Sequence, residues 1–123
     1  MHNPNKIVAG VPDTQAVATA VNGAATVTLA TPSATMQWLV NAITISMSGD
    51  PTTNPSFTVT TGAGGATTIE RIEFPNAACA PYNSRGIYIG TPGHAVTLSL
   101  PALGTGVRGT VTVRAMLIPA GSA

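Results

Sequence analysis

The side chains with the chemistry for catalysis are few, and their spacing keeps them apart. The 123-residue chain has two histidines, one cysteine and four acidic residues. Glu70 and Glu73 are close in sequence, but three residues along a strand place two side chains on opposite faces. General acid–base catalysis needs two such groups that converge on one substrate. We therefore expect these carboxylates to be structural, with Arg71 and Glu73 on a shared face.

The remaining reactive side chains form no metal or nucleophile pattern. His2, Cys79 and His94 are widely separated, and Cys79 lies between alanines and prolines without a basic neighbour that would favour the thiolate. The turn at Gly49-Asp50-Pro51 offers one carboxylate, which is poor for calcium. The glycines at 62–65 precede a strand pattern, so they predict a hairpin loop and not a phosphate cradle. We expect no enzyme, and no catalytic, metal or cofactor site.

Charge is scarce in this sequence. Only 7% of the residues are charged, 44% are hydrophobic, and the net charge is +1. Soluble proteins carry about 25% charged residues, and charge of both signs keeps dissolved molecules apart. A surface with so little charge suits a protein that packs against copies of itself or a partner. The basic residues are too few and scattered for nucleic acid, and no apolar run approaches the ~20 residues of a membrane helix. We therefore expect protein partners, and neither nucleic acid nor membrane.

Alternating polar and apolar residues between glycine- and proline-rich turns predict strands along most of the chain. No segment has the apolar spacing and caps of a confident helix. About eight short strands in one domain predict an all-β, jelly-roll-like β-sandwich, with a meander barrel as the alternative. Asn22-Gly23 is typical of a type I′ hairpin turn between the first two strands. The predicted strands span residues 15–21, 24–31, 37–48, 56–61, 67–74, 85–89, 94–100 and 108–118.

The N-terminal segment differs from the rest. Residues 1–14 lack a strand period and contain two prolines, so we expect an extended arm followed by a sandwich domain over 15–123. Ile7, Val8 and Val11 give this arm apolar side chains that need burial. The arm would therefore dock on a neighbouring chain, and a frayed terminus is the alternative.

The last predicted strand has one core face and one contact face. Arg114, Met116 and Ile118 share the face opposite the core, which begins polar and ends with two large apolar side chains. We expect these three residues to contact another subunit or a partner. The core face of the strand carries Val111, Val113, Ala115 and Leu117.

The third predicted strand also looks apolar on both faces. Strict alternation places Leu39, Ile43 and Ile45 on one face, and Trp38 and Val40 on the other. A sandwich strand normally has one wet face, and an exposed patch around a tryptophan favours aggregation. We therefore expect Trp38 and Val40 to be covered by another subunit, with a loop of the same chain as the alternative.

Two stretches of the sequence resemble small accessory structural proteins of tailed bacteriophages. One is a tryptophan-bearing strand that runs into a Ser-Gly-Asp turn within residues 35–52, and the other lies within residues 93–116; together they cover roughly half of the chain. The resemblance implies a capsid decoration or cement protein that stabilises the head lattice. It also implies synthesis in the bacterial cytoplasm, a place on the capsid surface, the major capsid protein as partner and a homo-oligomer, expected to be a trimer. The matching residues are Trp38, Ser48, Gly49, Asp50, Leu98, Pro101, Gly104, Gly106, Val107, Gly109, Val111 and Val113.

A different class of function stays open alongside this one. A receptor- or glycan-binding module of a phage fibre or a bacterial surface would need an exposed aromatic platform. Trp38, Tyr82 and Tyr88 are the candidates with a polar handle, although they lie on different predicted elements. An exposed cluster of these side chains would favour that alternative.

Overall fold

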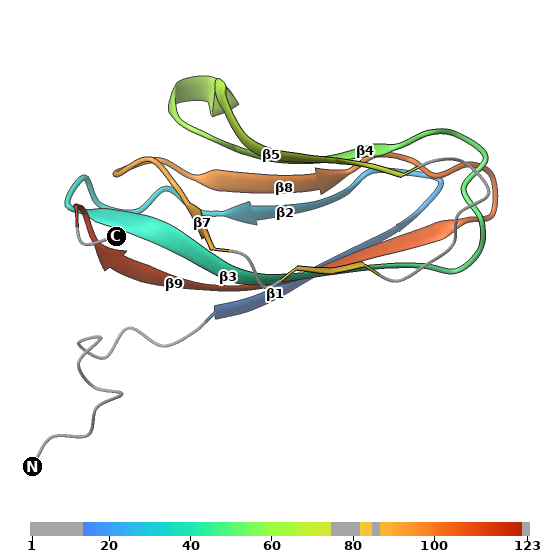
Figure 1. Cartoon of the computed structure of the whole chain (residues 1–123), viewed down its shortest axis with the longest axis horizontal. Coiled ribbons are helices and arrows are strands. Elements are labelled where there is room, and N and C mark those ends of the chain that lie inside the picture. The colour runs from blue at the N-terminus through green and yellow to red at the C-terminus, as the bar shows by residue number, and fades with distance from the viewer. Residues whose placement is uncertain (1–13, 75–81, 85–86, 122–123) are drawn as a thin grey trace, which may run out of the picture.

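The structure, a computed structural model, describes residues 14–74, 82–84 and 87–121 as a sandwich of two antiparallel sheets (Figure 1). One sheet has five strands in the order β1-β9-β3-β6, with β7 also pairing with β3, and the other has four in the order β2-β8-β4-β5. The predicted all-β sandwich is confirmed. The strands are β1 (Thr14–Val21), β2 (Ala25–Leu29), β3 (Met36–Met47), β4 (Ser56–Thr61), β5 (Thr67–Glu73), β6 (Tyr82–Ser84), β7 (Tyr88–Ile89), β8 (Val96–Leu100) and β9 (Arg108–Pro119).

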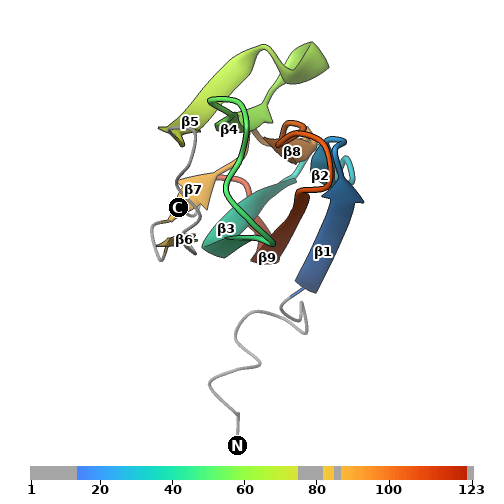
Figure 2. The ribbon, with the colours of Figure 1, turned by 90° about the vertical axis from the view of Figure 1, so that its right-hand side faces the viewer.

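The strands pair in a nested order. β1 pairs with β9, β2 with β8, β3 with both β6 and β7, and β4 with β5. A chain folded in this way is a long hairpin wrapped around itself, which agrees with the predicted jelly-roll-like topology. The wrapping brings β1 beside β9, while β5 lies at the far edge of the other layer (Figure 2).

The turn at Asn22-Gly23 corrects one prediction. Asn22 has the positive φ of 47° that an Asn-Gly turn favours, but the strands it joins belong to different sheets. The expected β1–β2 hairpin is therefore wrong. The backbone N–H of Asn22 donates instead to the carbonyl of Val107 at 3.0 Å.

A β-bulge in β3 corrects a second prediction. Val40 lies opposite Ala115 and Ala42 lies opposite Arg114, so Asn41 is an extra residue in the strand. A bulge shifts the alternation by one residue. As a result Trp38 and Val40 share the core face with Ile43, whereas Leu39 faces outward. The expected two-sided apolar strand was a consequence of assuming regular alternation through residue 41.

The core fills the space between the two sheets. Its side chains come from the inner faces of the long strands, and alanines on β1 and aromatic residues at the β5–β6 edge pack around it. The predicted core face of β9 is confirmed, since Val111, Val113 and Ala115 are fully buried and Leu117 packs against the cluster. The buried core residues are Ala25, Val27, Leu29, Trp38, Val40, Ile43, Ile45, Phe57, Val59, Phe74, Val96, Leu98, Leu100, Leu103, Val107, Val111, Val113 and Ala115.

Loops at the two ends of the sandwich follow the turn chemistry of the sequence. The glycines at 62–65 form the predicted hairpin loop between β4 and β5, with a short 3₁₀ turn over Ala63–Gly65. The loop before β9 passes close to another loop: a Cβ on Gly104 would collide with the Thr52 hydroxyl, and Gly104 has a φ of 118°. Residues 75–81, with the single Cys79, and residues 85–86 lie outside the described part of the chain. The end of the strand predicted over 85–89 corresponds to β7, and β6 lies just before that range.

Candidate functional site

The two predicted interface residues on β3 are buried within the chain. Trp38 is 8% exposed and Val40 is 0% exposed. The indole Nε1–H of Trp38 donates to the carbonyl of Ala30 at 2.8 Å, so the polar atom of this side chain is satisfied inside the domain. Neither residue presents a surface to another subunit. The bulge at Asn41, which the sequence pattern does not reveal, is the physical reason for this correction.

The three predicted interface residues on β9 lie on the outer face of the five-stranded sheet. Arg114 is exposed, and Met116 and Ile118 are half-buried. Met116 lies opposite Leu39, which in turn lies opposite Ile89 of β7. The outer face of this sheet therefore ends in a small apolar patch formed by Leu39, Ile89 and Met116. The predicted arm residues Ile7, Val8 and Val11 lie outside the described residues.

The exposed edge strand β1 carries a surface that the sequence reasoning missed. Val17 and Val21 are 58% and 55% exposed, and both lie on the outer face of the five-stranded sheet. β1 pairs with β9 along its whole length without a register shift. Within the described chain its other edge pairs with no strand. The signal in the sequence is the uncharged strand TQAVATAV, whose larger apolar residues alternate with alanines that pack on the core.

Hydroxyl side chains cover most of the remaining sheet surface. Every outward-facing position on β2, β4 and β8 is serine or threonine. Thr26 lies opposite Ser99 with their hydroxyls 3.0 Å apart, and Ser99 lies opposite Thr58. Across the five-stranded sheet, Thr19 and Thr110 are paired in the same way with their hydroxyls 3.3 Å apart. Hydroxyl ladders of this kind hydrate a surface without charge, and they explain how a chain with 7% charged residues has a polar exterior.

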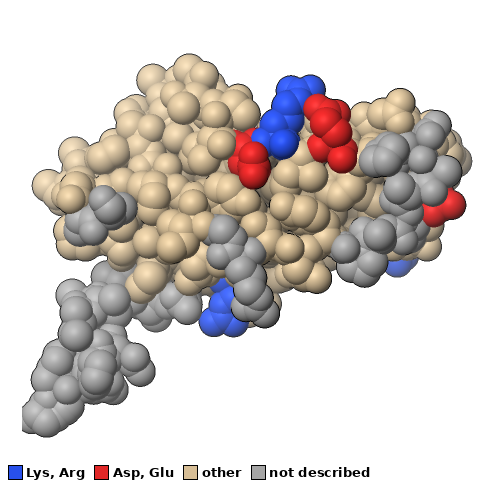
Figure 3. Space-filling model, in the orientation of Figure 1, with Lys and Arg blue, Asp and Glu red and all other residues tan. Residues whose placement is uncertain are grey.

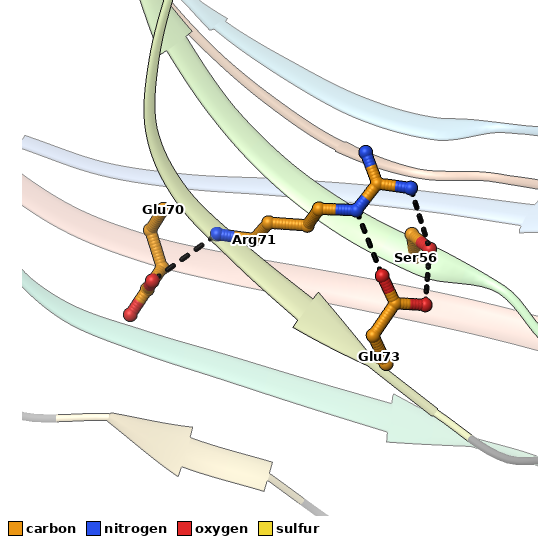
Figure 4. A network of polar contacts seen from close by, with 4 residues as sticks. All are labelled: Ser56, Glu70, Arg71 and Glu73. Carbon is orange, nitrogen blue, oxygen red and sulfur yellow. Dashed lines mark hydrogen bonds and ion pairs between the residues drawn. The ribbon is translucent and has the colours of Figure 1, made fainter.

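The charged side chains of β5 form one exposed network (Figure 4). Arg71 Nε donates to Glu73 Oε2 at 2.7 Å, and the Ser56 hydroxyl donates to Glu73 Oε1 at 2.6 Å. These hydrogen bonds from Arg71 and Ser56 hold the pKa of Glu73 below its usual value. Glu70 is directed to the opposite face and accepts from the Arg71 backbone N–H at 3.1 Å. The predicted opposite orientation of the two carboxylates is confirmed, and the pair has no shared substrate position.

Two tyrosines lie at the side of the sandwich next to Glu70. The Tyr88 and Ser84 hydroxyls are 2.8 Å apart, and the Tyr88 hydroxyl donates to Glu70 Oε2 at 3.5 Å. Although the bond to Ser84 alone would lower it, burial and the neighbouring Tyr82 and Glu70 raise the pKa of Tyr88 above its usual value. Tyr82 and Tyr88 are both half-buried, and Tyr82 packs edge-on against Phe74 with 5.9 Å between ring centroids. Trp38 lies in the core, so of the three candidate aromatic residues only Tyr82 and Tyr88 remain at the surface.

The surface around these features is largely uncharged (Figure 3). Among the described residues, no group of three histidine, cysteine, aspartate or glutamate side chains is placed to hold a metal ion. The backbone N–H of His94 donates to the carbonyl of Thr91 at 3.0 Å, as a turn residue does. None of the described helical segments is long and apolar enough to cross a membrane.

Comparison with known proteins identifies a fold and not a family. No protein-family profile and no curated protein sequence matches the chain. The fold is similar to that of a chain in the acidic stable capsid structure of Helicobacter pylori bacteriophage KHP30, with a TM-score of 0.53 and 17% sequence identity. That alignment covers 85% of this chain and 86% of the capsid chain, so the two are of similar length.

Two other solved structures align with most of this chain. Dimeric latent PorU from Porphyromonas gingivalis matches with a TM-score of 0.51 and 9% identity, covering 89% of this chain but only 13% of PorU. The C-terminal CBM6 of LamC, a laminarinase from Zobellia galactanivorans, has 12% identity and covers 76% of this chain and 73% of that one. Its TM-score of 0.40 is too low to support a shared architecture. At these identities the comparisons establish the β-sandwich alone.

Proposed function

We propose that this chain is a non-enzymatic structural protein of a phage particle, a decoration or cement protein that binds the outside of the head lattice. It would act as a homo-oligomer, expected to be a trimer, with the major capsid protein as its partner. The single observation that carries the proposal is the phage capsid chain of similar length and fold, aligned over most of both chains. The resemblance of residues 35–52 and 93–116 to phage accessory proteins supports the same assignment.

The surface supports a role in packing between proteins. The outer face of the four-stranded sheet carries serine and threonine on β2, β4 and β8, and the five-stranded sheet has a small apolar patch at Leu39, Ile89 and Met116 and exposed valines on β1. Such a surface has few charges that must be desolvated when a neighbour covers it, and burying a charge without a partner is costly. A protein that spends its functional life in a lattice benefits from this property.

The mechanism we propose is mechanical. Each copy would bridge adjacent capsid subunits through loops and sheet faces, and each bridge adds buried area across a joint of the lattice. Individual contacts of this size are weak, but many copies on one particle act together, because multivalent attachment raises the effective affinity without any new kind of contact. Head stability would then depend on occupancy of the whole surface.

Removing the protein from the particle tests the proposal. Heads assembled without this chain should release their DNA at a lower temperature than complete heads, and adding the purified protein should restore the higher temperature. A Val113→Asp variant, which should not fold, controls for unspecific effects of added protein. Equal heat resistance with and without the chain would refute the cement function.

A glycan- or receptor-binding module is the second candidate, and one observation favours it. Tyr82, Tyr88 and Glu70 gather half-buried polar and aromatic atoms at the side of the sandwich. Aromatic faces and carboxylates are common in sugar sites. A glycan array would distinguish the two functions: specific binding that a Tyr88→Ala variant loses would favour the module, whereas the decoration protein should bind no glycan.

A further inference from the structure

The edge strand β1 lacks the usual protection against strand pairing. Free sheet edges are normally blunted by charged side chains, prolines, bulges or short length, because their unpaired backbone groups accept another strand. β1 is eight residues long and contains no charged residue and no proline, and its pairing with β9 shows no bulge. Figure 2 shows β1 at the margin of its sheet. It also carries Val17 and Val21, two of the large hydrophobic side chains that are exposed among the described residues.

The other edges differ from β1 in this respect. β5, at the far edge of the four-stranded sheet, carries Glu70, Arg71 and Glu73 and has a register shift at Val59/Thr60. β6 and β7 are only three and two residues long. β2 is uncharged but has five residues. Among the described edge strands, β1 is therefore the longest one that carries neither a charge, a proline nor a bulge.

We propose that β1 is an interface with a second copy of this chain, in which the two β1 strands pair antiparallel about a two-fold axis through Ala18. An axis through Ala18 pairs odd-numbered residues with odd-numbered residues, so that Val17 lies opposite Thr19 of the second copy. The core-facing side chains of both copies then stay on the same side of one continuous sheet. This register aligns seven of the eight residues of β1 with their counterparts. It is also isologous, because the same surface patch serves both copies.

Charge and side-chain size both fit a second copy as the occupant. Neither strand brings a charge to the contact, so pairing desolvates none and opposes no like charges. Outward-facing Val17 lies diagonal to the valines of the second copy, at a separation that permits contact between large side chains. A four-valine cluster would therefore cover side chains that are more than half exposed in the single chain.

The contact between the two β1 strands is small. One strand from each copy buries less than the about 1,200–2,000 Å² of a standard stable interface. This contact, which would be additional to the interfaces of the expected trimer, should therefore be weak in dilute solution and become occupied where copies are concentrated on a surface. This inference rests on the proposed function for its setting, since it names how neighbouring decoration proteins would meet.

A charge placed on the edge tests the pairing by sedimentation velocity of the full chain across the micromolar to millimolar range. Val17→Lys changes an exposed side chain and should weaken self-association at least about tenfold. Thr68→Lys, which adds the same charge to the exposed face of β5, should associate like the wild type. A wild type that stays monomeric, or a Val17→Lys variant that associates normally, would overturn the proposal.

A cross-link identifies the occupant. With Cys79 replaced by serine, an Ala18→Cys variant should form a disulfide-linked dimer on mild oxidation, because the axis places the two residues opposite each other, whereas Thr68→Cys should not. Association that disappears on deleting Met1–Val11 would show that the arm, and not β1 of a second copy, occupies the edge.

Normal head stabilisation by Val17→Lys would overturn only the lattice role of this contact. Absence of head stabilisation by the wild type would overturn the proposed function and leave the dimer standing.

Discussion

Trp38 and Ile43 lie five residues apart on one strand, yet both side chains point into the same core. An odd separation would place them on opposite faces of a regular strand. The bulged Asn41 between them restores the shared direction. Its side-chain Oδ1 is buried and accepts no hydrogen bond within the described chain. This residue therefore contributes local geometry to β3 and adds no ladder pairing.

Deletion of Asn41 should be tolerated. Without it Val40 and Ala42 become consecutive, keep Ala115 and Arg114 as partners, and leave every core residue of β3 facing inward. Deletion of Thr44, in the regular part of the strand, should unfold the domain, because a slip of one residue turns the strand over. Circular dichroism melts of both variants check this. A folded Thr44 deletion together with an unfolded Asn41 deletion would contradict the described register.

Trp38 should report on the core and not on assembly. It is the single tryptophan of the chain and is 8% exposed. Its fluorescence should be blue-shifted, resist acrylamide quenching and stay unchanged when the protein is diluted to its monomer. An increase in quenching on dissociation would place Trp38 at a subunit interface, as the sequence pattern alone predicted.

Opposite faces of β9 should respond differently to the same substitution. Val113 is fully buried, and a carboxylate there would cost several kcal/mol, a large part of the 5–15 kcal/mol that stabilises a typical domain. Met116 is half-buried on the outer face, where a carboxylate stays hydrated in the single chain. Val113→Asp should therefore unfold the protein, whereas Met116→Asp should fold and bind heads poorly. Circular dichroism and a head-binding assay separate the two effects, and a reversed outcome would mean that the faces are exchanged.

The Glu73 network should give a small, pH-dependent contribution to stability. Hydrogen bonds from Arg71 and Ser56 lower the pKa of Glu73 in the folded chain. The stabilisation is therefore present above the unfolded-state pKa and is lost as the pH falls through the folded-state pKa. Wild type should exceed Glu73→Gln slightly in urea denaturation at neutral pH, less so in high salt, and match it in strong acid. A difference that persists in acid would point to a cause other than the carboxylate charge.

Local patterns predicted the positions of the strands well, but they predicted the pairing between strands less well. The alternation in residues 56–61 and 108–118 matches β4 and β9 closely, because each strand has one strongly apolar face. The sequence predicted a turn at Asn22-Gly23, but local sequence could not predict that this turn joins two different sheets or that β3 bulges at Asn41. Both depend on long-range pairing, with Val107 beside Asn22 and Ala115 and Arg114 beside the bulge. The bulge at Asn41 explains why the interface was assigned to Trp38 and Val40. The expected hairpin at Asn22-Gly23 explains why the free edge of β1 was not predicted.

The position of the protein on an intact particle tests the central proposal most directly. Cryo-electron microscopy of complete heads and of heads lacking this chain should give a difference density on the outer capsid surface. That density should repeat with the capsid lattice, fit the two-sheet sandwich and contact the major capsid protein across subunit joints. Density confined to a tail or fibre tip, or no difference on the head at all, would contradict the decoration function.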